Sequence, residues 1–327
     1  MPQALTLEQK RSFYRDGFVV LPGVVPPEMV AAARRRIFVG LGGGEPARGT
    51  DAVFMDLYNR TDIAAIIAEA LGPIVRHRGV QLASQFPRDP SERINESGYP
   101  DRDTPFFGWH GHLDGLWNGA APMHQDVSRA MTAEEHDAWH GDPSRNGCLK
   151  CHPERNVNIM NFAALVGVAL SDQTEEGVGN VGVLKGAHHE MERFFRGQRE
   201  AGGPLGPDGP GWPRVDTGAP NASGLRHYPD AVREAFRPHG VETADGRFWP
   251  KPTLVRMAAG DAVLVLHAVP HCATRVEGSE PRLMAYFRIM PERRPSANRS
   301  IYPEALCDIW HEWPGMATVV AEQRGAE

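Results

Sequence analysis

Residues 109–115 read Trp-His-Gly-His-Leu-Asp-Gly and govern the interpretation of the whole chain. They end a predicted β-strand at 106–114. Side chains alternate between the two faces of a strand, so His112 and Asp114 point the same way, about 7 Å apart, and can converge on one cation. The tripeptide alone is a weak signal, because a chain with 14 histidines and 41 acidic residues contains such spacings by chance.

A further metal ligand has to come from a distant part of the chain. Residues 260–271 read Gly-Asp-Ala-Val-Leu-Val-Leu-His-Ala-Val-Pro-His, which predicts a turn and then a strand at 262–266. His271 lies where this run meets a proline, and His267 is its rival. Two imidazoles and one carboxylate are the facial triad typical of non-haem Fe(II) oxygenases. Taken alone, either histidine is better explained as a structural residue of the core or of a loop.

Arg282, eleven residues beyond His271, opens a predicted strand at 282–290. One face of this strand carries Leu283, Ala285, Phe287 and Ile289, and the other carries Arg282, Met284, Tyr286 and Arg288. An arginine on the inner face of a barrel is unfavourable unless it meets an anion. A dicarboxylate cosubstrate would supply one, held by a bidentate guanidinium pair, whereas the alternative is a surface strand with two solvated arginines.

Taken together, these segments resemble the phytanoyl-CoA dioxygenase family of Fe(II)/2-oxoglutarate oxygenases. The likeness spans most of the chain. Residues 5–37 resemble the family's opening, and residues 182–188 are similar to its G-x-L-x-x-x-G-S-H stretch, with Ala187 in place of serine and a shifted glycine. The strongest element is the order of H-x-D, then G-D-x9-H, then x10-R.

The resemblance implies a set of site residues. Three catalytic iron ligands are implied, His112, Asp114 and His271. Arg282 is implied as the partner of the distal carboxylate of 2-oxoglutarate, which is consumed together with dioxygen. Relatives that halogenate lack the acidic ligand, so the presence of Asp114 favours hydroxylation, or another oxidation, of a small organic substrate with release of succinate and CO2.

Four further residues are weaker candidates for the site. The family often places amide side chains on the strand before H-x-D, and Gln81 and Gln85, on one face of a predicted strand at 75–86, match that position best. The resemblance therefore implies that they contact the cosubstrate. Trp109 and Trp117 flank the proposed site and are candidates for a substrate pocket, although tryptophan is more often a core residue.

Two other kinds of function remain alternatives. One is a cupin-like metalloenzyme that uses His110, His112 and a later histidine without 2-oxoglutarate. The other is a barrel that binds a ligand without turning it over. Succinate release from 2-oxoglutarate separates the proposed enzyme from both.

Other metal-binding patterns have simpler interpretations. Cys148-Leu-Lys-Cys151-His152 matches the haem c attachment pattern, which requires export, and a zinc site is a further alternative to a plain loop with two reduced thiols. The histidines at 136 and 140 lack the glutamate of H-E-x-x-H, so a surface helix is favoured. His188 is expected to pack near the barrel mouth without binding metal.

The composition is that of an ordinary globular protein. Of 327 residues, 41% are hydrophobic and 23% charged, and the net charge of −6 argues against nucleic acid as the main partner. No apolar run approaches the roughly 20 residues of a membrane-spanning helix. The first residues lack the apolar segment of a secretory signal, and four cysteines suit a reducing compartment. We expect a cytoplasmic protein with a small-molecule substrate and no membrane partner, and the oligomeric state stays open.

The strongest helix signals lie in the first third of the chain. Thr6-Leu7-Glu8-Gln9 matches a capping box for a helix to about residue 14, and Pro26-Pro27 starts a second helix to about residue 37. A third helix follows Thr61 and is stopped by Gly72-Pro73. Its apolar stripe consists of Ile63, Ile66, Ile67, Ala70 and Leu71.

Later segments have the composition of strands. Besides those already named, we predict strands at 16–22, 157–170, 180–184 and 253–258. The 35 glycines and 28 prolines favour turns and short strands, and residues 115–156 and 196–252 are predicted to be ordered insertions. We therefore predict one domain, residues 1–327, that is mainly β with flanking α. Its fold would be a double-stranded β-helix, a cupin-like jelly roll, with the N-terminal helices packed on one sheet.

Overall fold

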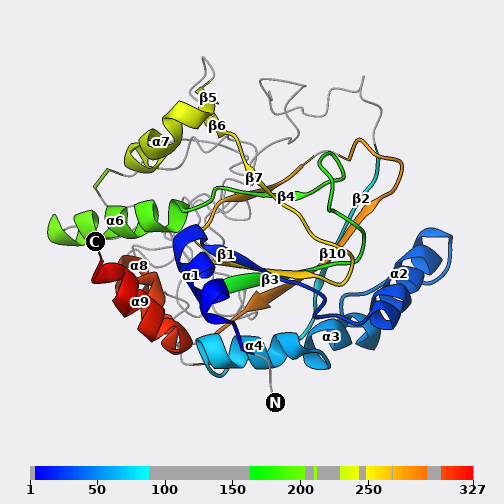
Figure 1. The fold of residues 1–327 in the computed structure, drawn as a ribbon. Coiled ribbons are helices and arrows are strands. Elements are labelled where there is room, and N and C mark those ends of the chain that lie inside the picture. The colour runs from blue at the N-terminus through cyan, green and yellow to red at the C-terminus, as the bar shows by residue number, and fades with distance from the viewer. Residues whose placement is uncertain are drawn as a thin grey trace, which may run out of the picture.

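The computed structural model describes residues 4–87, 163–202, 210–211, 229–242, 248–266, 268–274, 276–292 and 303–326 (Figure 1). Among these residues, more lie in helices than in strands, and the strands form antiparallel sheets. Over the described residues the fold is therefore mixed α/β with antiparallel sheets, and the mainly β character of the whole chain stays a prediction. Besides the helices predicted in the first third of the chain, the structure contains a helix at Ala52–Asn59 and several helices beyond residue 186 that were not predicted from the sequence.

The first helix, α1 (Leu7–Asp16), confirms the predicted capping box. The Thr6 hydroxyl accepts from the Gln9 backbone N–H at 3.2 Å, and the Gln9 side chain accepts from the Thr6 N–H at 2.9 Å. The helix ends at Gly17, whose φ of 77° suits glycine. A Cβ at Gly17 would also lie 2.6 Å from Nδ1 of His188, so this position has no room for a side chain.

Three further helices follow along the chain. They are α2 (Pro27–Leu41), α3 (Ala52–Asn59) and α4 (Asp62–Leu71). The predicted apolar stripe of α4 is confirmed, because all five of its residues are buried, and the helix ends at Gly72 with φ 91°. Helix α2 runs four residues beyond its predicted end, and α3 was not predicted.

The larger sheet has five antiparallel strands in the order β1-β8-β3-β10-β2. These strands are β1 (Phe18–Leu21), β8 (Ala262–Leu266), β3 (Ala164–Ala169), β10 (Arg282–Ile289) and β2 (Gln81–Gln85). Strand β8 has the predicted limits. Strand β2 is shorter than the predicted 75–86, because the backbone N–H groups of Val75 and Val80 bond to Met290 and Gly49 instead of a neighbouring strand.

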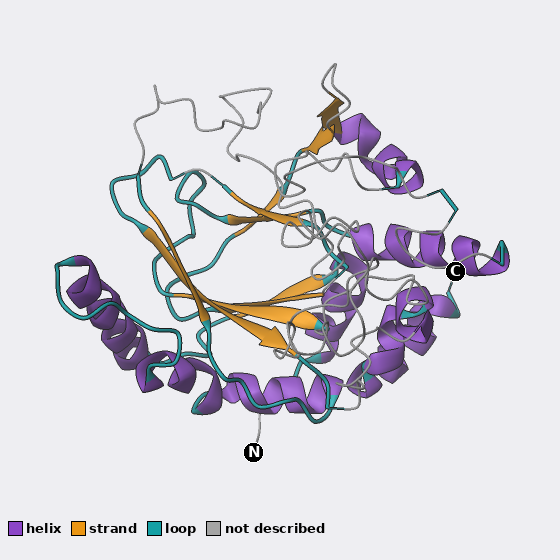
Figure 2. Cartoon of the chain, turned by 180° about the vertical axis from the view of Figure 1, so that it is seen from behind, coloured by secondary structure: helices purple, strands orange, loops and turns teal. Residues whose placement is uncertain are grey.

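One face of the larger sheet is apolar and covered by helices. On β10 this face carries Leu283, Ala285, Phe287 and Ile289, all fully buried. Tyr58 of α3 packs on Phe287 with ring centroids 5.4 Å apart, and Figure 2 shows α3 and α4 lying along this side of the sheet. Burying each of the larger side chains stabilises the fold by about 1.5–3 kcal/mol. The predicted packing of N-terminal helices on one sheet is thus present.

The smaller sheet faces the other side of the larger one (Figures 1 and 2). Its antiparallel order is β7-β4-β9, with β7 (Thr253–Val255), β4 (Val181–Val183) and β9 (His271–Ala273). Two facing antiparallel sheets are what a jelly roll requires. The strand predicted at 106–114 lies outside the described residues, so the complete jelly roll and the single domain stay predictions.

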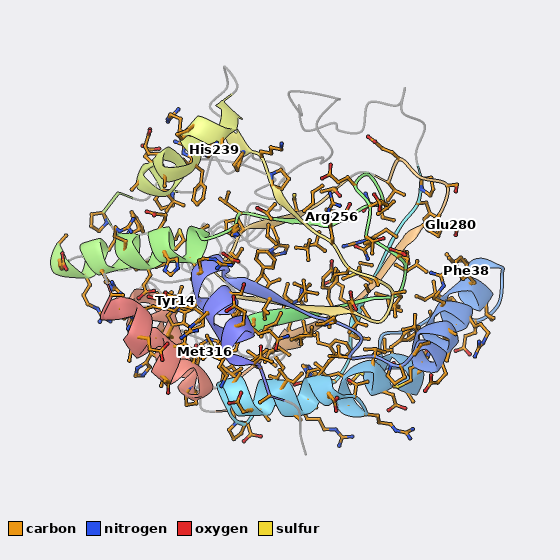
Figure 3. All side chains as sticks on the ribbon, viewed as in Figure 1. Tyr14, Phe38, His239, Arg256, Glu280 and Met316 are labelled. Atoms are coloured by element: carbon orange, nitrogen blue, oxygen red, sulfur yellow. The ribbon has the colours of Figure 1, made fainter. Side chains whose placement is uncertain are left out.

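The remaining elements lie on the side of the molecule that α1 occupies (Figure 1). The predicted insertion at 196–252 includes the end of α6 (Ala187–Glu200), α7 (Asp230–Phe236), η4 (Arg237–His239) and the hairpin β5 (Gly240–Glu242) with β6 (Phe248–Pro250). The C-terminal elements are α8 (Pro303–Cys307), η5 (Ile309–Glu312), η6 (Pro314–Met316) and α9 (Ala317–Arg324). Figure 3 shows Tyr14 and Met316 where α1 meets this C-terminal group. Among the described residues, no helix has the length and apolar character needed to cross a membrane.

Candidate functional site

Arg282 is a buried cation between the two sheets. It lies at the start of β10 and is only 5% exposed. Its Nη2 donates a hydrogen bond to the Tyr286 hydroxyl, and its Cζ lies 5.6 Å from the centre of the Tyr286 ring. Its Nε is buried without a hydrogen-bond partner, and the described part of the chain places no carboxylate within ion-pair distance of it. Such a guanidinium is stabilised strongly by an anionic ligand.

The face of β10 that carries Arg282 looks toward the smaller sheet. Gly179, just before β4, is so close that a Cβ there would lie 2.8 Å from Cβ of Arg282. Gln173 forms an isolated antiparallel β-bridge with Met257, which follows β7. Its Nε2 donates to the Met284 sulfur at 3.0 Å. The predicted division of β10 into an inner and an outer face is therefore confirmed by its contacts, and the surface-strand alternative for Arg282 is wrong.

The two predicted glutamines lie on this inner face at different depths. In the register of β2 and β10, Gln85 is opposite Arg282 and Gln81 is opposite Tyr286. Gln85 is half-buried, and its Nε2 donates to the Thr274 carbonyl at 2.8 Å. Gln81 is exposed. Gln85 is therefore the amide that adjoins the buried cation.

A chain of buried polar groups, which the sequence did not reveal, extends from Gln85. The Thr274 hydroxyl donates to the Asn180 carbonyl at 2.6 Å, and Asn180 Nδ2 donates to the Gln173 carbonyl at 2.8 Å. The side-chain oxygens of Asn180 and Gln173 are buried and have no hydrogen-bond partner in the described part of the structure. These contacts use main-chain carbonyls, so no residue spacing marks them. The only sequence signal is that Asn180 opens a predicted strand.

Two glycines give the inner face its shape. Gly179 has φ 82°, and its missing side chain leaves room for the stem of Arg282. Gly167 of β3 lies opposite Tyr286, and a Cβ there would lie 2.7 Å from Cε1 of the tyrosine ring. Neither glycine was singled out from the sequence, because a close approach between side chain and backbone leaves no local pattern.

His271 begins β9 in the smaller sheet, opposite Val183 of β4. Burial lowers the pKa of His271 below the usual value for histidine, although a hydrogen bond to Val269 opposes this. That bond runs from Nδ1 to the Val269 carbonyl oxygen at 3.3 Å. A neutral imidazole that donates through Nδ1 carries its lone pair on Nε2, which is the state that metal binding requires.

The other predicted metal ligands, His112 and Asp114, lie outside the described residues. So do the tryptophans at 109 and 117, the cysteines at 148 and 151, and the rival His267. Within the described ranges, no three His, Cys, Asp or Glu side chains gather as a metal site would require. The predicted triad would take only its third member, His271, from these ranges.

His188 occupies a structural position. It is fully buried in the first turn of α6, and its Nε2 lies 2.7 Å from the Tyr14 carbonyl oxygen. Its ring also lies against Gly17 at the end of α1. These contacts fix α6 to α1 and agree with the prediction that this histidine serves packing.

Comparisons with known proteins give distant structural likenesses only. No protein-family model matches the chain, and no curated protein matches it. HygX from Streptomyces hygroscopicus, with nickel and 2-oxoglutarate bound, is similar with a TM-score of 0.46 and 16% identity over 89% of this chain and 88% of that one.

Two further solved structures come from nogalamycin chemistry. The epimerase SnoN, in complex with Fe3+, alpha-ketoglutarate and nogalamycin RO, gives a TM-score of 0.47 and 16% identity over 88% of this chain and 86% of that one. The non-haem alpha-ketoglutarate-dependent carbocyclase SnoK from nogalamycin biosynthesis gives a TM-score of 0.46 and 14% identity over 89% of this chain and 87% of that one. At these identities and scores, the likenesses assign neither a reaction nor a substrate to this chain.

Proposed function

We propose that the protein is a non-haem Fe(II)/2-oxoglutarate-dependent dioxygenase that oxidises, most simply by hydroxylation, a small organic substrate and releases succinate and CO2. One observation carries the proposal. Arg282, the residue that the sequence motif assigns to the cosubstrate carboxylate, is buried between two facing sheets with no acidic partner among the described residues. A buried guanidinium of this kind favours a carboxylate ligand with bidentate geometry.

The proposed metal ligands are His112, Asp114 and His271. This donor set suits ferrous iron, which would activate dioxygen toward a substrate C–H bond. The fit can be judged at His271, whose hydrogen bond to Val269 and lowered pKa favour the neutral imidazole that a metal binds. His112 and Asp114 enter the proposal from the sequence alone.

The chain's own residues would bind and orient the cosubstrate. Arg282 would pair with the distal carboxylate, and Gln85, directly opposite on β2, would help to surround it. Gln81 is exposed and is the weaker candidate for such a contact. Trp109 and Trp117 are proposed to line the substrate pocket, and the insertions at 115–156 and 196–252 to select the substrate.

The test is succinate formation by the purified full chain. With Fe(II), dioxygen and 2-oxoglutarate, we expect slow succinate release without added substrate and a faster release with the correct one. The matched variant Arg282→Ala should lose this activity at low 2-oxoglutarate, whereas Arg288→Ala, on an exposed residue of the same strand, should keep it. A cupin-like enzyme and a binding barrel both predict no succinate, so its absence in the wild-type protein refutes the proposal.

A further inference from the structure

We propose that Tyr286 is a positioning residue that holds the Arg282 guanidinium in place, and that this contact sets the protein's preference for 2-oxo acids with a second carboxylate. The inference rests on the proposed function and names which of the chain's groups decides the cosubstrate class. It concerns a residue to which the sequence motif gives no role.

The contact determines where the guanidinium lies. Residues four apart on a strand are separated by about 13 Å, so Arg282 reaches Tyr286 only if its side chain runs along the inner face, past Met284. The hydroxyl accepts from Nη2, and the Cζ distance of 5.6 Å from the ring centre adds a cation–π contact. The hydrogen bond to the tyrosine therefore places the guanidinium on the inner face of β10, between the two sheets, and not at the end of the strand.

The surroundings hold both partners in this arrangement. Gly179 lies against the stem of Arg282, and Gly167 lies against the ring of Tyr286, so neither side chain can move toward the neighbouring backbone. Met284, between them on the same face, is fully buried and accepts a hydrogen bond from Gln173. The stem of the arginine is thus held by Gly179, its middle lies along Met284, and its guanidinium is held by the Tyr286 hydroxyl.

A fixed guanidinium is what selective recognition of a carboxylate needs. Arginine has many rotamers, and a contact that orders it before the ligand arrives lowers the entropy lost on binding. The Tyr286 hydroxyl engages Nη2, while the buried Nε has no partner among the described residues and is available to a carboxylate. Loss of the hydroxyl should weaken binding of the second carboxylate and leave the rest of the cosubstrate site unchanged.

The experiment compares two acids on the full chain loaded with Mn(II). 2-Oxoglutarate has a second carboxylate, and 2-oxopentanoate has the same number of carbons without it. By titration calorimetry we expect Tyr286→Phe to lower the affinity for 2-oxoglutarate about five- to tenfold and to leave the affinity for 2-oxopentanoate unchanged. In turnover, the KM for 2-oxoglutarate should rise by a similar factor, while kcat stays within about twofold.

Two further variants are compared with Tyr286→Phe, one as a control and one as a second disturbance of the same contact. Arg288→Gln changes an exposed residue on the same strand and should alter neither affinity. Gly167→Ala keeps the hydroxyl but puts a methyl group 2.7 Å from the tyrosine ring, so it should reduce the preference for 2-oxoglutarate as Tyr286→Phe does. If Tyr286→Phe fails to fold, this variant decides the question with the same pair of acids.

The outcomes separate the inference from the proposed function. If the wild-type protein binds no 2-oxoglutarate, the proposed function fails and the inference fails with it. If the wild type binds 2-oxoglutarate and the variants lower the affinity for both acids equally, Tyr286 serves the fold only. The inference alone is then wrong. An unchanged preference in the folded variants overturns it as well.

Discussion

Gln85 and Arg282 stand directly opposite each other on the neighbouring antiparallel strands β2 and β10. Side chains in such a pair share one face, with Cβ atoms about 4.5–5.5 Å apart. Gln85 also donates to the Thr274 carbonyl at 2.8 Å, so the pair reaches the segment that follows β9. Two strands of the larger sheet and the segment after β9 therefore lie around the buried cation, which makes this region a suitable place for an anionic ligand.

Replacing Arg282 by alanine should weaken 2-oxoglutarate binding about 10- to 100-fold, since the lost charge-assisted hydrogen bonds are worth roughly 1.5–3 kcal/mol. Calorimetric titration of the metal-loaded protein measures the effect. Arg288→Ala, on the same strand but exposed, provides the control and should bind normally. An unchanged affinity for 2-oxoglutarate in Arg282→Ala would remove the arginine from the site.

The two glutamines should respond differently to the same substitution. Gln85→Leu leaves the Thr274 carbonyl without its side-chain donor, so we expect the free energy of unfolding to fall by about 1–2 kcal/mol and 2-oxoglutarate affinity to fall with it. Gln81→Leu changes an exposed residue and should shift stability by less than about 0.5 kcal/mol. Denaturant unfolding of both variants tests this, and equal losses would contradict it.

The sequence predicted elements whose periodicity is local. The stripe of α4 is buried as predicted, β8 has its predicted limits, and the alternation in β10 separates Arg282 from the helix-covered face. In each case the pattern lies within one element, and it reflects which side of that element packs against a single neighbouring layer. The alternation therefore predicted which face of β10 carries Arg282 before any tertiary contact was known.

Elements defined by distant contacts were missed. The C-terminal helices are short, and Trp313 at their junction is buried because it packs 5.1 Å from Phe13 of α1. Strand β2 is shorter than predicted because the preceding backbone pairs with Gly49 and Met290. The same holds for Tyr286 in the site, whose role follows from where the Arg282 side chain ends.

A buried carboxylate links α6 to the C-terminal elements. Glu192 is 4% exposed and contacts Arg196, and Nη2 of Arg324 donates to it at 3.0 Å. Arg324 also pairs with Asp308 at 2.8 Å. Burial raises the pKa of Glu192 to about 7, against the attraction of the two arginines.

This raised pKa predicts a pH-dependent stability. The folded state binds the Glu192 proton more tightly than the unfolded state, so the stabilisation is full below the unfolded pKa of about 4.5 and is lost as the pH rises through about 7. Relative to Glu192→Gln, the wild-type free energy of unfolding should fall by about 2–3 kcal/mol between about pH 5 and about pH 8.

Urea unfolding of the two proteins across this range gives the difference directly. Taking the difference matters because burial lowers the pKa of His77 to about 4, and a histidine shifted in that direction makes stability rise with pH. Both proteins share that contribution. A constant difference across the range would show that Glu192 titrates normally.

The metal triad is tested by choosing between the two histidines that the sequence left as rivals. His271→Ala should reduce retained Fe(II) by at least about 10- to 100-fold, which is the loss seen when even the partners of a metal ligand are removed. His267→Ala should retain the metal. The reason is that Nδ1 of His271 lies 3.3 Å from the Val269 carbonyl oxygen, a contact that favours the tautomer a metal ligand needs. Metal content after anaerobic loading and desalting measures both variants, and retention by His271→Ala together with loss by His267→Ala would reverse the assignment.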